Sequence, residues 1–178
     1  MNQIYIHPKR KTKVVFVQLG SPSEPTAKAL RKYLRKFLGD PRVIDINPWL
    51  WKIILNFFVL PFRPKKSAKL YARIWDGKSF PLITNTRDFT NNVREELKKI
   101  DPHGHVEVNH AFLLSPPYVN EVYDSWEDDL KKGVGATKLL VIPMFPQYSE
   151  STIASGIDAL AKELSKRVKI PTFEVITN

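Results

Sequence analysis

The densest group of side chains that could bind a ligand lies at residues 147–152, Gln-Tyr-Ser-Glu-Ser-Thr. The apolar run 138–144 precedes this polar cluster and is typical of a buried strand, and the residues that follow have helical apolar spacing. Open α/β sheets bind ligands in such loops, at the carboxyl ends of their strands. An ordinary serine or threonine helix cap is the alternative interpretation. The candidate ligand-binding residues are Tyr148, Ser149, Ser151 and Thr152.

Other kinds of chemistry lack their usual residues in this sequence. The chain has no cysteine, which excludes disulfides, thiolate nucleophiles and sulfur-bound metal sites. Its four histidines form no pair with metal-ligand spacing on a predicted helix, and His110 is more typical of a core histidine. Residues 19–22, Leu-Gly-Ser-Pro, match no phosphate-binding loop, and no catalytic triad pattern occurs. The sequence therefore predicts no protein-only metal site.

Four apolar runs predict the strands that must position the candidate residues. Amphipathic segments with helical spacing alternate with these runs. Alternation of this kind predicts an α/β fold, a doubly wound open parallel sheet flanked by helices. The strands are expected at 13–19, 106–113, 138–144 and 172–177, and the helices at 26–38, 66–75, 85–99, 118–132 and 153–164, with a short extended piece at 43–46.

The first half of the chain is strongly basic and contains an unusual apolar segment. Residues 1–78 carry 17 Lys and Arg against 4 Asp and Glu, in a chain of net charge +10. Residues 49–62 are apolar nearly all round but too few to span a bilayer. A core helix, an interfacial helix and a lip on a pocket are the three interpretations. The charge of the first half favours an anionic partner, namely nucleic acid, anionic lipid or a polycarboxylate ligand, with a basic solvated surface as the alternative. The arrangement of lysines and aromatic residues suits a membrane surface better than nucleic acid.

Several segments along the chain form an ordered set of motifs. They include the first strand with its loop, a Phe-Leu-x-Asp-x-Arg-Val-Ile-Asp segment, an apolar stretch before basic residues and a Ser-Ala-x-x-Tyr-x-x-Ile-Trp segment, and the block Pro-Gln-Tyr-Ser-Glu-Ser-Thr completes the set. These stretches are 15–22, 34–46, 53–66, 67–75 and 146–152. They resemble segments of bacterial ferrochelatases in the same order, and the resemblance, which is specific as an ordered group, covers about 13–178.

The resemblance implies a chelatase-like lobe that serves the insertion of ferrous iron into a porphyrin, a lyase reaction of haem biosynthesis. Iron and porphyrin would be substrates, and no permanently bound cofactor is implied. Leu19 and Gly20 would lie against the macrocycle face, and Arg73 would bind a propionate through paired hydrogen bonds. The candidates at 148–152 would line the wall of the cleft.

This sequence also departs from the family pattern. The family's catalytic histidine motif and its partner glutamate come after position 178, so no catalytic residue is expected in this segment. Glu150 stands where some members have a cluster-binding cysteine, so no iron–sulfur cluster is implied, and Phe80 and Phe112 replace a usual serine and arginine. The expected organisation is a basic tail at 1–12 and an N-terminal lobe at 13–178, without a C-terminal lobe and inactive alone.

Three functions remain open from the sequence. The first is a ferrochelatase-like enzyme whose N-terminal lobe contacts the porphyrin, and the second is a non-catalytic tetrapyrrole-binding or assembly module. The third is a basic peripheral-membrane protein. The expected partners are a porphyrin, a C-terminal half or a second copy, and an anionic membrane, but no nucleic acid. Without a predicted span or signal peptide, the expected location is cytoplasmic, with membrane association as an option.

Overall fold

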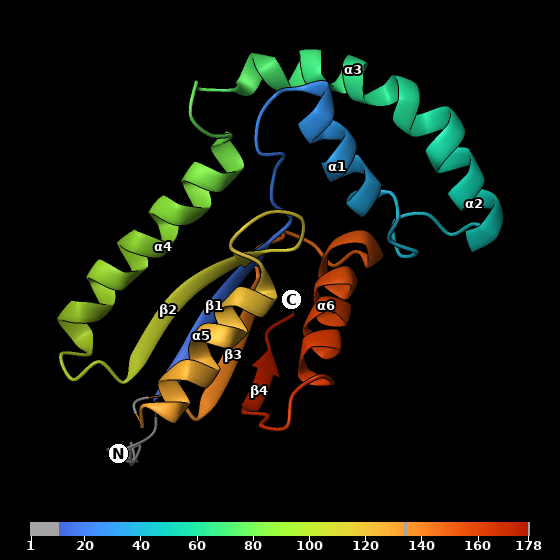
Figure 1. The fold of residues 1–178 in the computed structure, drawn as a ribbon. Coiled ribbons are helices and arrows are strands. Elements are labelled where there is room, and N and C mark those ends of the chain that lie inside the picture. Colours follow the sequence, from blue (N-terminus) through green and yellow to red (C-terminus); the bar gives the residue numbers. More distant parts are fainter. Residues whose placement is uncertain (1–10, 134, 178) are drawn as a thin grey trace.

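A four-stranded sheet, parallel throughout, forms the centre of the computed structural model, which describes residues 11–133 and 135–177 (Figure 1). The strands are β1 (Thr12–Gln18), β2 (Val106–Phe112), β3 (Lys138–Pro143) and β4 (Thr172–Val175), in the order β2-β1-β3-β4. The register pairs Phe16 of β1 with His110 on one side and Ile142 on the other. The predicted parallel sheet is therefore confirmed, with each strand ending one or two residues early. Most of the predicted basic tail lies outside the described residues.

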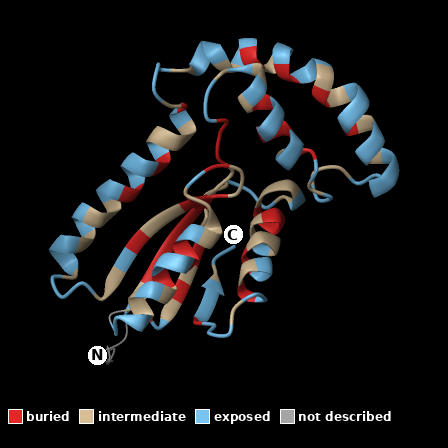
Figure 2. Ribbon diagram, in the orientation of Figure 1, coloured by how far each residue is buried: buried red, intermediate tan, exposed pale blue. Residues whose placement is uncertain are grey.

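Helices cover both faces of the sheet, as the doubly wound prediction requires. Helices α5 (Val119–Lys131) and α6 (Ser155–Leu164) pack with Val15 and Val17 in the largest core, and Figure 2 shows the buried residues between these layers. Helix α4 (Pro81–Ile100) covers the opposite face, where Val14 and Phe16 point. The alternating side chains of one buried strand thus supply two cores.

A second group of helices lies beyond the carboxyl ends of the strands (Figure 1). It comprises α1 (Ala27–Phe37), α2 (Pro48–Ile54), the π-helical turn η1 (Leu55–Val59), α3 (Leu60–Tyr71) and the 3-10 turn η2 (Ala72–Ile74). Thr26 caps α1 by accepting a hydrogen bond from the Ala29 N–H at 3.2 Å. The indole Nε1 of Trp51 donates to the Leu38 carbonyl at 2.6 Å and ties α2 to the end of α1. This group has its own small core.

Residues 48–74 form one nearly continuous helical run, which corrects two predictions from the sequence. The helix expected at 66–75 begins earlier and belongs to this run, and the piece expected to be extended at 43–46 consists of turns and loop. The run accommodates Pro61 by a π-helical turn, in which the Leu60 N–H bonds to the Leu55 carbonyl. A π turn widens the helix where a proline would crowd the preceding carbonyl.

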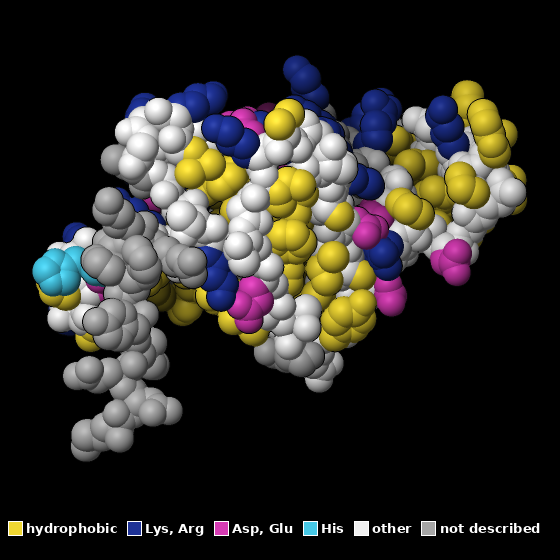
Figure 3. All heavy atoms as spheres, turned by 90° about the horizontal axis from the view of Figure 1, so that it is seen from below, with side chains coloured by type: hydrophobic (Ala, Val, Ile, Leu, Met, Phe, Trp, Pro, Cys, Tyr) yellow, Lys and Arg dark blue, Asp and Glu magenta, His cyan; other side chains and the backbone are white. Residues whose placement is uncertain are grey.

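One side of this run is an exposed apolar stripe. Trp49 is 78% exposed, Phe57 71% and Phe62 72%, and Leu50, Ile53 and Phe58 also face solvent. The interpretation of 49–62 as a sealed core helix is therefore wrong, and the lip and interfacial interpretations both remain predictions. Figure 3 shows hydrophobic side chains beside Lys and Arg at this end of the molecule. Within the described residues, no helix combines the length and apolar character needed to cross a bilayer.

Candidate functional site

The loops that follow β1, β2 and β3 meet at one edge of the sheet. The Leu113 N–H donates to the Gln18 carbonyl at 3.0 Å, and the Leu114 N–H donates to the Leu19 carbonyl at 3.0 Å. The Gln18 side chain donates to the Met144 carbonyl at 2.7 Å. The strand ends therefore hold three loops together at the place where open α/β sheets bind ligands.

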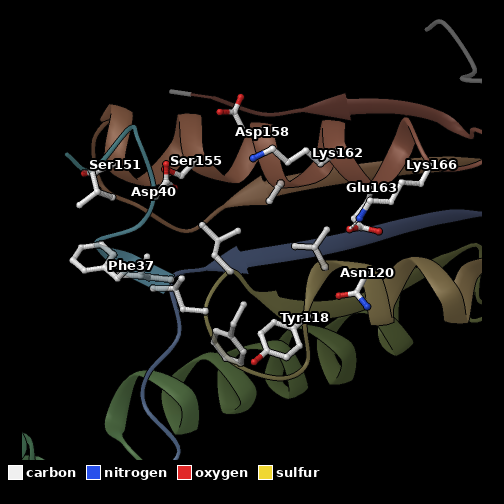
Figure 4. A pocket seen from close by; sticks show the side chains of 17 residues that line it. Phe37, Asp40, Tyr118, Asn120, Ser151, Ser155, Asp158, Lys162, Glu163 and Lys166 are labelled. Atoms are coloured by element: carbon white, nitrogen blue, oxygen red, sulfur yellow. Dashed lines mark hydrogen bonds and ion pairs between the residues drawn. The ribbon is translucent and has the colours of Figure 1, made fainter. Parts of the chain in front are cut away.

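A cavity of about 270 Å³ opens beside these loops. Figure 4 shows it between α6 and the start of α5, with Phe37 at one end. Leu19, Phe112 and Leu113 give it an apolar base, and Tyr118 and Asn120 lie across from α6. Its charges are mixed, because Asp40, Asp158, Glu163, Lys162 and Lys166 all line it. The cavity offers apolar contact with polar groups at the margin, as small-molecule sites do.

The predicted hydroxyl residues form one cluster, but only part of it faces the cavity. The Ser149 and Thr152 hydroxyls lie 2.5 Å apart, and the Ser149 and Ser151 hydroxyls lie 3.4 Å apart. Ser151 lines the cavity, whereas Tyr148 is 52% exposed outside it. Ser149 occupies the cap position of the π turn η3 (Glu150–Ala154), yet its side chain accepts no capping bond from the backbone. The helix-cap interpretation is therefore not borne out for this serine.

Gly20 allows the first loop to approach the second. Its φ is +92°, a conformation that residues with a Cβ rarely adopt. A Cβ at this position would also lie 3.0 Å from the Phe112 Cβ and would press against the Ser115 hydroxyl. The Ser21 N–H donates to that hydroxyl at 3.3 Å, and Tyr33 donates its hydroxyl to the Gly20 carbonyl at 3.4 Å. Burial raises the pKa of Tyr33, so the donor stays neutral.

Arg73 lies apart from the other predicted site residues. It is exposed on the 3-10 turn η2 and does not line the cavity. The structure thus brings Leu19, Gly20 and the hydroxyl cluster to one edge without Arg73. Its predicted contact with a propionate remains a prediction.

Arg42 is a residue that the sequence interpretation missed. Its guanidinium binds Asp158 of α6 through two hydrogen bonds, of 2.6 and 3.0 Å, and Glu150 of η3 through one of 2.6 Å. This arginine therefore joins the loop after α1 to the helix that forms one side of the cavity. The hydrogen bonds from Arg42 lower the pKa of Asp158. The two partners lie more than 100 positions from Arg42, so no local pattern indicates the contact.

His110 lies on β2, on the face covered by α4. Its Nδ1 is buried and has no hydrogen-bond partner among the described residues. Burial lowers the pKa of His110, and the nearby Arg94 and Arg87 lower it further. The imidazole is therefore neutral near pH 7, and its ring lies against Phe112 with a centroid distance of 5.5 Å. In the described part of the chain, no group of three His, Cys, Asp or Glu is arranged to hold a metal.

The fold is an α/β lobe whose strand-end loops border a cavity at one edge of a parallel sheet. Residues 11–178 match the model of the ferrochelatase family, and the chain belongs to that family. It is 41% identical to a ferrochelatase of Idiomarina loihiensis and 40% identical to a coproporphyrin III ferrochelatase of Streptococcus mutans. Both alignments cover 94% of this chain, but 44% and 50% of those proteins. The chain thus spans about half the length of these relatives.

Replacing Gly20 with alanine should destabilise the lobe more than the same change at Gly77. Both residues have φ near +92°, so each substitution stores roughly 1–3 kcal/mol of backbone strain. Only position 20 is crowded, which adds roughly 1–3 kcal/mol of overpacking. Urea unfolding measures the two losses of unfolding free energy. Equal losses for Gly20→Ala and Gly77→Ala would show that the two loops do not pack closely.

Replacing Arg42 with glutamine should destabilise the lobe at pH 7 and much less near pH 3. Asp158 has a lowered pKa, so its pairing stabilises the fold above the ordinary value of about 3.9 and is lost as pH falls through the folded pKa. The measurement is the unfolding midpoint of wild type and Arg42→Gln at both pH values. Arg87→Gln is the control, because its pair with Asp88 joins neighbours in one helix. A loss of stability in Arg42→Gln that does not change with pH would contradict a stabilising contact between Arg42 and Asp158.

Proposed function

We propose that this chain supplies the porphyrin-contacting wall of a ferrochelatase. The observation that carries the proposal is the meeting of the Gly20 loop, the Leu113 loop and the hydroxyl cluster at one apolar edge. A cavity of about 270 Å³ falls below the roughly 300–1,000 Å³ of sites that enclose whole ligands. It suits one side of a cleft that a second lobe completes.

In this proposal the macrocycle lies against the loop of Leu19 and Gly20, of which Leu19 lines the cavity. Ser151 supplies the polar side, Ser149 and Thr152 lie next to it in the same hydroxyl cluster, and Tyr148 lies at the outer margin. Arg73 meets a propionate only if the porphyrin's edge extends beyond the cavity toward η2. The Streptococcus mutans relative is named for coproporphyrin III, which makes this tetracarboxylate porphyrin the first ligand to test.

Metal insertion also requires a base that accepts the two pyrrole protons. Among the described histidines, His110 lies on the face of the sheet that α4 covers, with its Nδ1 buried. A base must lie within hydrogen-bond reach of the proton it removes, and no described histidine is among the residues that line the cavity. The proposed role of this chain is therefore to bind and orient the porphyrin, with the proton acceptor on another lobe.

Coproporphyrin III should bind the lone chain, and the lone chain should insert little iron. Quenching of porphyrin fluorescence measures binding, and appearance of the iron–porphyrin spectrum under reducing conditions measures turnover. A bulky change at the wall, Ser151→Trp, should weaken binding about tenfold or more, whereas Ser165→Trp, on an exposed turn, should not. Absence of binding would contradict the proposed wall. Rapid turnover that His110→Ala abolishes would assign the base to this chain.

The second candidate function, contact with an anionic membrane, rests on the exposed apolar stripe. Trp49, Phe57 and Phe62 are exposed on a helical run, and exposed apolar patches of this kind mark contact surfaces. Lys52, Arg63, Lys65, Lys66 and Lys69 are exposed on the same run and complement anionic head groups. The same stripe could instead mediate self-association or receive a C-terminal half. The salt dependence of binding distinguishes membrane contact from the two apolar associations, because apolar association holds or strengthens as salt rises.

The chain should bind vesicles with about 30% anionic lipid at low salt, and it should bind neutral vesicles only weakly. Added salt should weaken binding, because screening reduces the attraction of each lysine. Co-sedimentation measures the bound fraction, and Phe57→Ser with Phe62→Ser should abolish it. The control is Ile100→Ser with Val168→Ser, which removes exposed apolar residues elsewhere. Equal loss with both pairs, or no binding at low salt, would contradict the membrane candidate.

A further inference from the structure

A turn with two histidines lies at the opposite edge of the sheet from the candidate site. His103 and His105 flank Gly104 in the connection between α4 and β2. The Thr12 N–H, at the start of β1, donates to the His105 carbonyl at 2.7 Å. The turn therefore lies at the amino ends of the strands, and the seven residues of β2 separate it from the loop at 113–115 by roughly 20 Å.

The turn brings the two imidazole rings into contact at the surface. The Gly104 N–H donates to the Asp101 carbonyl at 3.1 Å, and the φ of Gly104 is +65°, a conformation that favours glycine. The ring centroids of His103 and His105 are 5.7 Å apart, with an angle of 71° between the planes. His103 is exposed and His105 partly exposed, and Figure 3 shows histidine side chains at the surface. A solute can therefore reach both rings.

Asp101 orients the imidazole of His105. The hydrogen bond from His105 is the main cause that lowers the pKa of Asp101, so the carboxylate is charged at neutral pH. One carboxylate oxygen lies 3.0 Å from Nδ1 of His105, and the other accepts a hydrogen bond from the Val106 N–H at 2.8 Å. A charged carboxylate only accepts, so Nδ1 carries a hydrogen and Nε2 is left to bind a metal. Histidines that bind metals commonly donate their other nitrogen to a carboxylate in this way.

The spacing of the two rings fits a shared metal ion. A ligand nitrogen lies roughly 2.1 Å from a zinc ion, which holds the centres of two imidazoles on one ion roughly 5–6 Å apart. The observed 5.7 Å falls in this range. Among the described residues, none forms a hydrogen bond with a ring nitrogen of His103 or with Nε2 of His105. Packing of the two rings on each other is the alternative explanation for their contact.

We propose that His103 and His105 bind one divalent transition metal ion, with water in its remaining positions and Asp101 as the carboxylate that orients His105. Imidazole suits zinc, copper and nickel ions, whereas magnesium and calcium prefer oxygen ligands. Two protein ligands leave the ion open to water, in keeping with the lack of any group of three suitable side chains in the described part of the chain. The two histidines lack helical spacing, which is why the sequence predicted no metal site. The site lies far from the proposed porphyrin wall and goes beyond the proposed function.

Titration calorimetry of the untagged chain with zinc chloride, near neutral pH in a buffer that does not bind metals, tests the site. Wild type should bind one zinc ion saturably, and magnesium chloride should give no binding. Asp101→Asn should weaken zinc binding about tenfold, and His103→Ala and His105→Ala should each weaken it at least as much. The control is His7→Ala, which removes a histidine outside the described residues and should leave affinity within about twofold.

A paramagnetic ion locates the site without any substitution. Substoichiometric copper should broaden the amide NMR signals of residues 101–106 and leave those of 19–21 and 149–152 sharp, because the two regions are roughly 20 Å apart. Matching thermal midpoints of the variants without metal would show that each is folded.

Three results would overturn the proposal. They are absence of saturable zinc binding to wild type, which ring packing alone predicts, equal weakening by His7→Ala and His105→Ala, and broadening by copper of a different region. Porphyrin binding is measured separately by fluorescence, so failure of the proposed porphyrin wall would leave this test unaffected.

Discussion

The close approach of two backbone segments at the carboxyl ends of β1 and β2 is the constraint on which the site depends. Gly20 permits it, because its positive φ and missing Cβ let residues 19–21 lie against Phe112 and Ser115. The Leu114 N–H then bonds to the Leu19 carbonyl. Leu19, which precedes this glycine, lines the cavity. A single glycine thus positions the loop that borders the candidate site.

The strands and most helices could be predicted from the sequence, because their signal is local. Val14 to Val17 are apolar without interruption, as both faces of β1 are covered. The run at 48–74 was only partly predicted, because a π turn before Pro61 continues a helix that a proline usually ends. Lys13 is 1% exposed between Glu107 and Asp129, at 3.3 and 3.7 Å, although a lysine at a strand end suggests solvent. The burial of Lys13, like the contacts of Arg42 with Asp158 and Glu150, depends on residues that are distant in the sequence.

The candidate site residues divide in the same way, into those with a local sequence signal and those whose position depends on distant residues. The position of the hydroxyl cluster and of the Gly20 loop at strand ends was predicted, since each follows a recognisable strand, whereas their role in binding remains a prediction. Arg73 was expected beside them but lies exposed on η2, because helical spacing says little about how a helical layer is placed over a sheet. The open cavity and the exposed stripe share one physical feature. Both leave apolar surface that a further lobe, a membrane or a second copy could bury, and apolar burial is the main source of association energy.

The central claim is that the loops at the strand ends form a porphyrin wall, and amide hydrogen exchange with and without coproporphyrin III tests it most directly. The account predicts slower exchange at residues 19–21, 113–115 and 149–152 on binding, with little change along α4 or β4. Saturable binding that leaves those three loops unchanged and instead protects residues 49–62 would place the porphyrin on the apolar stripe and contradict the account.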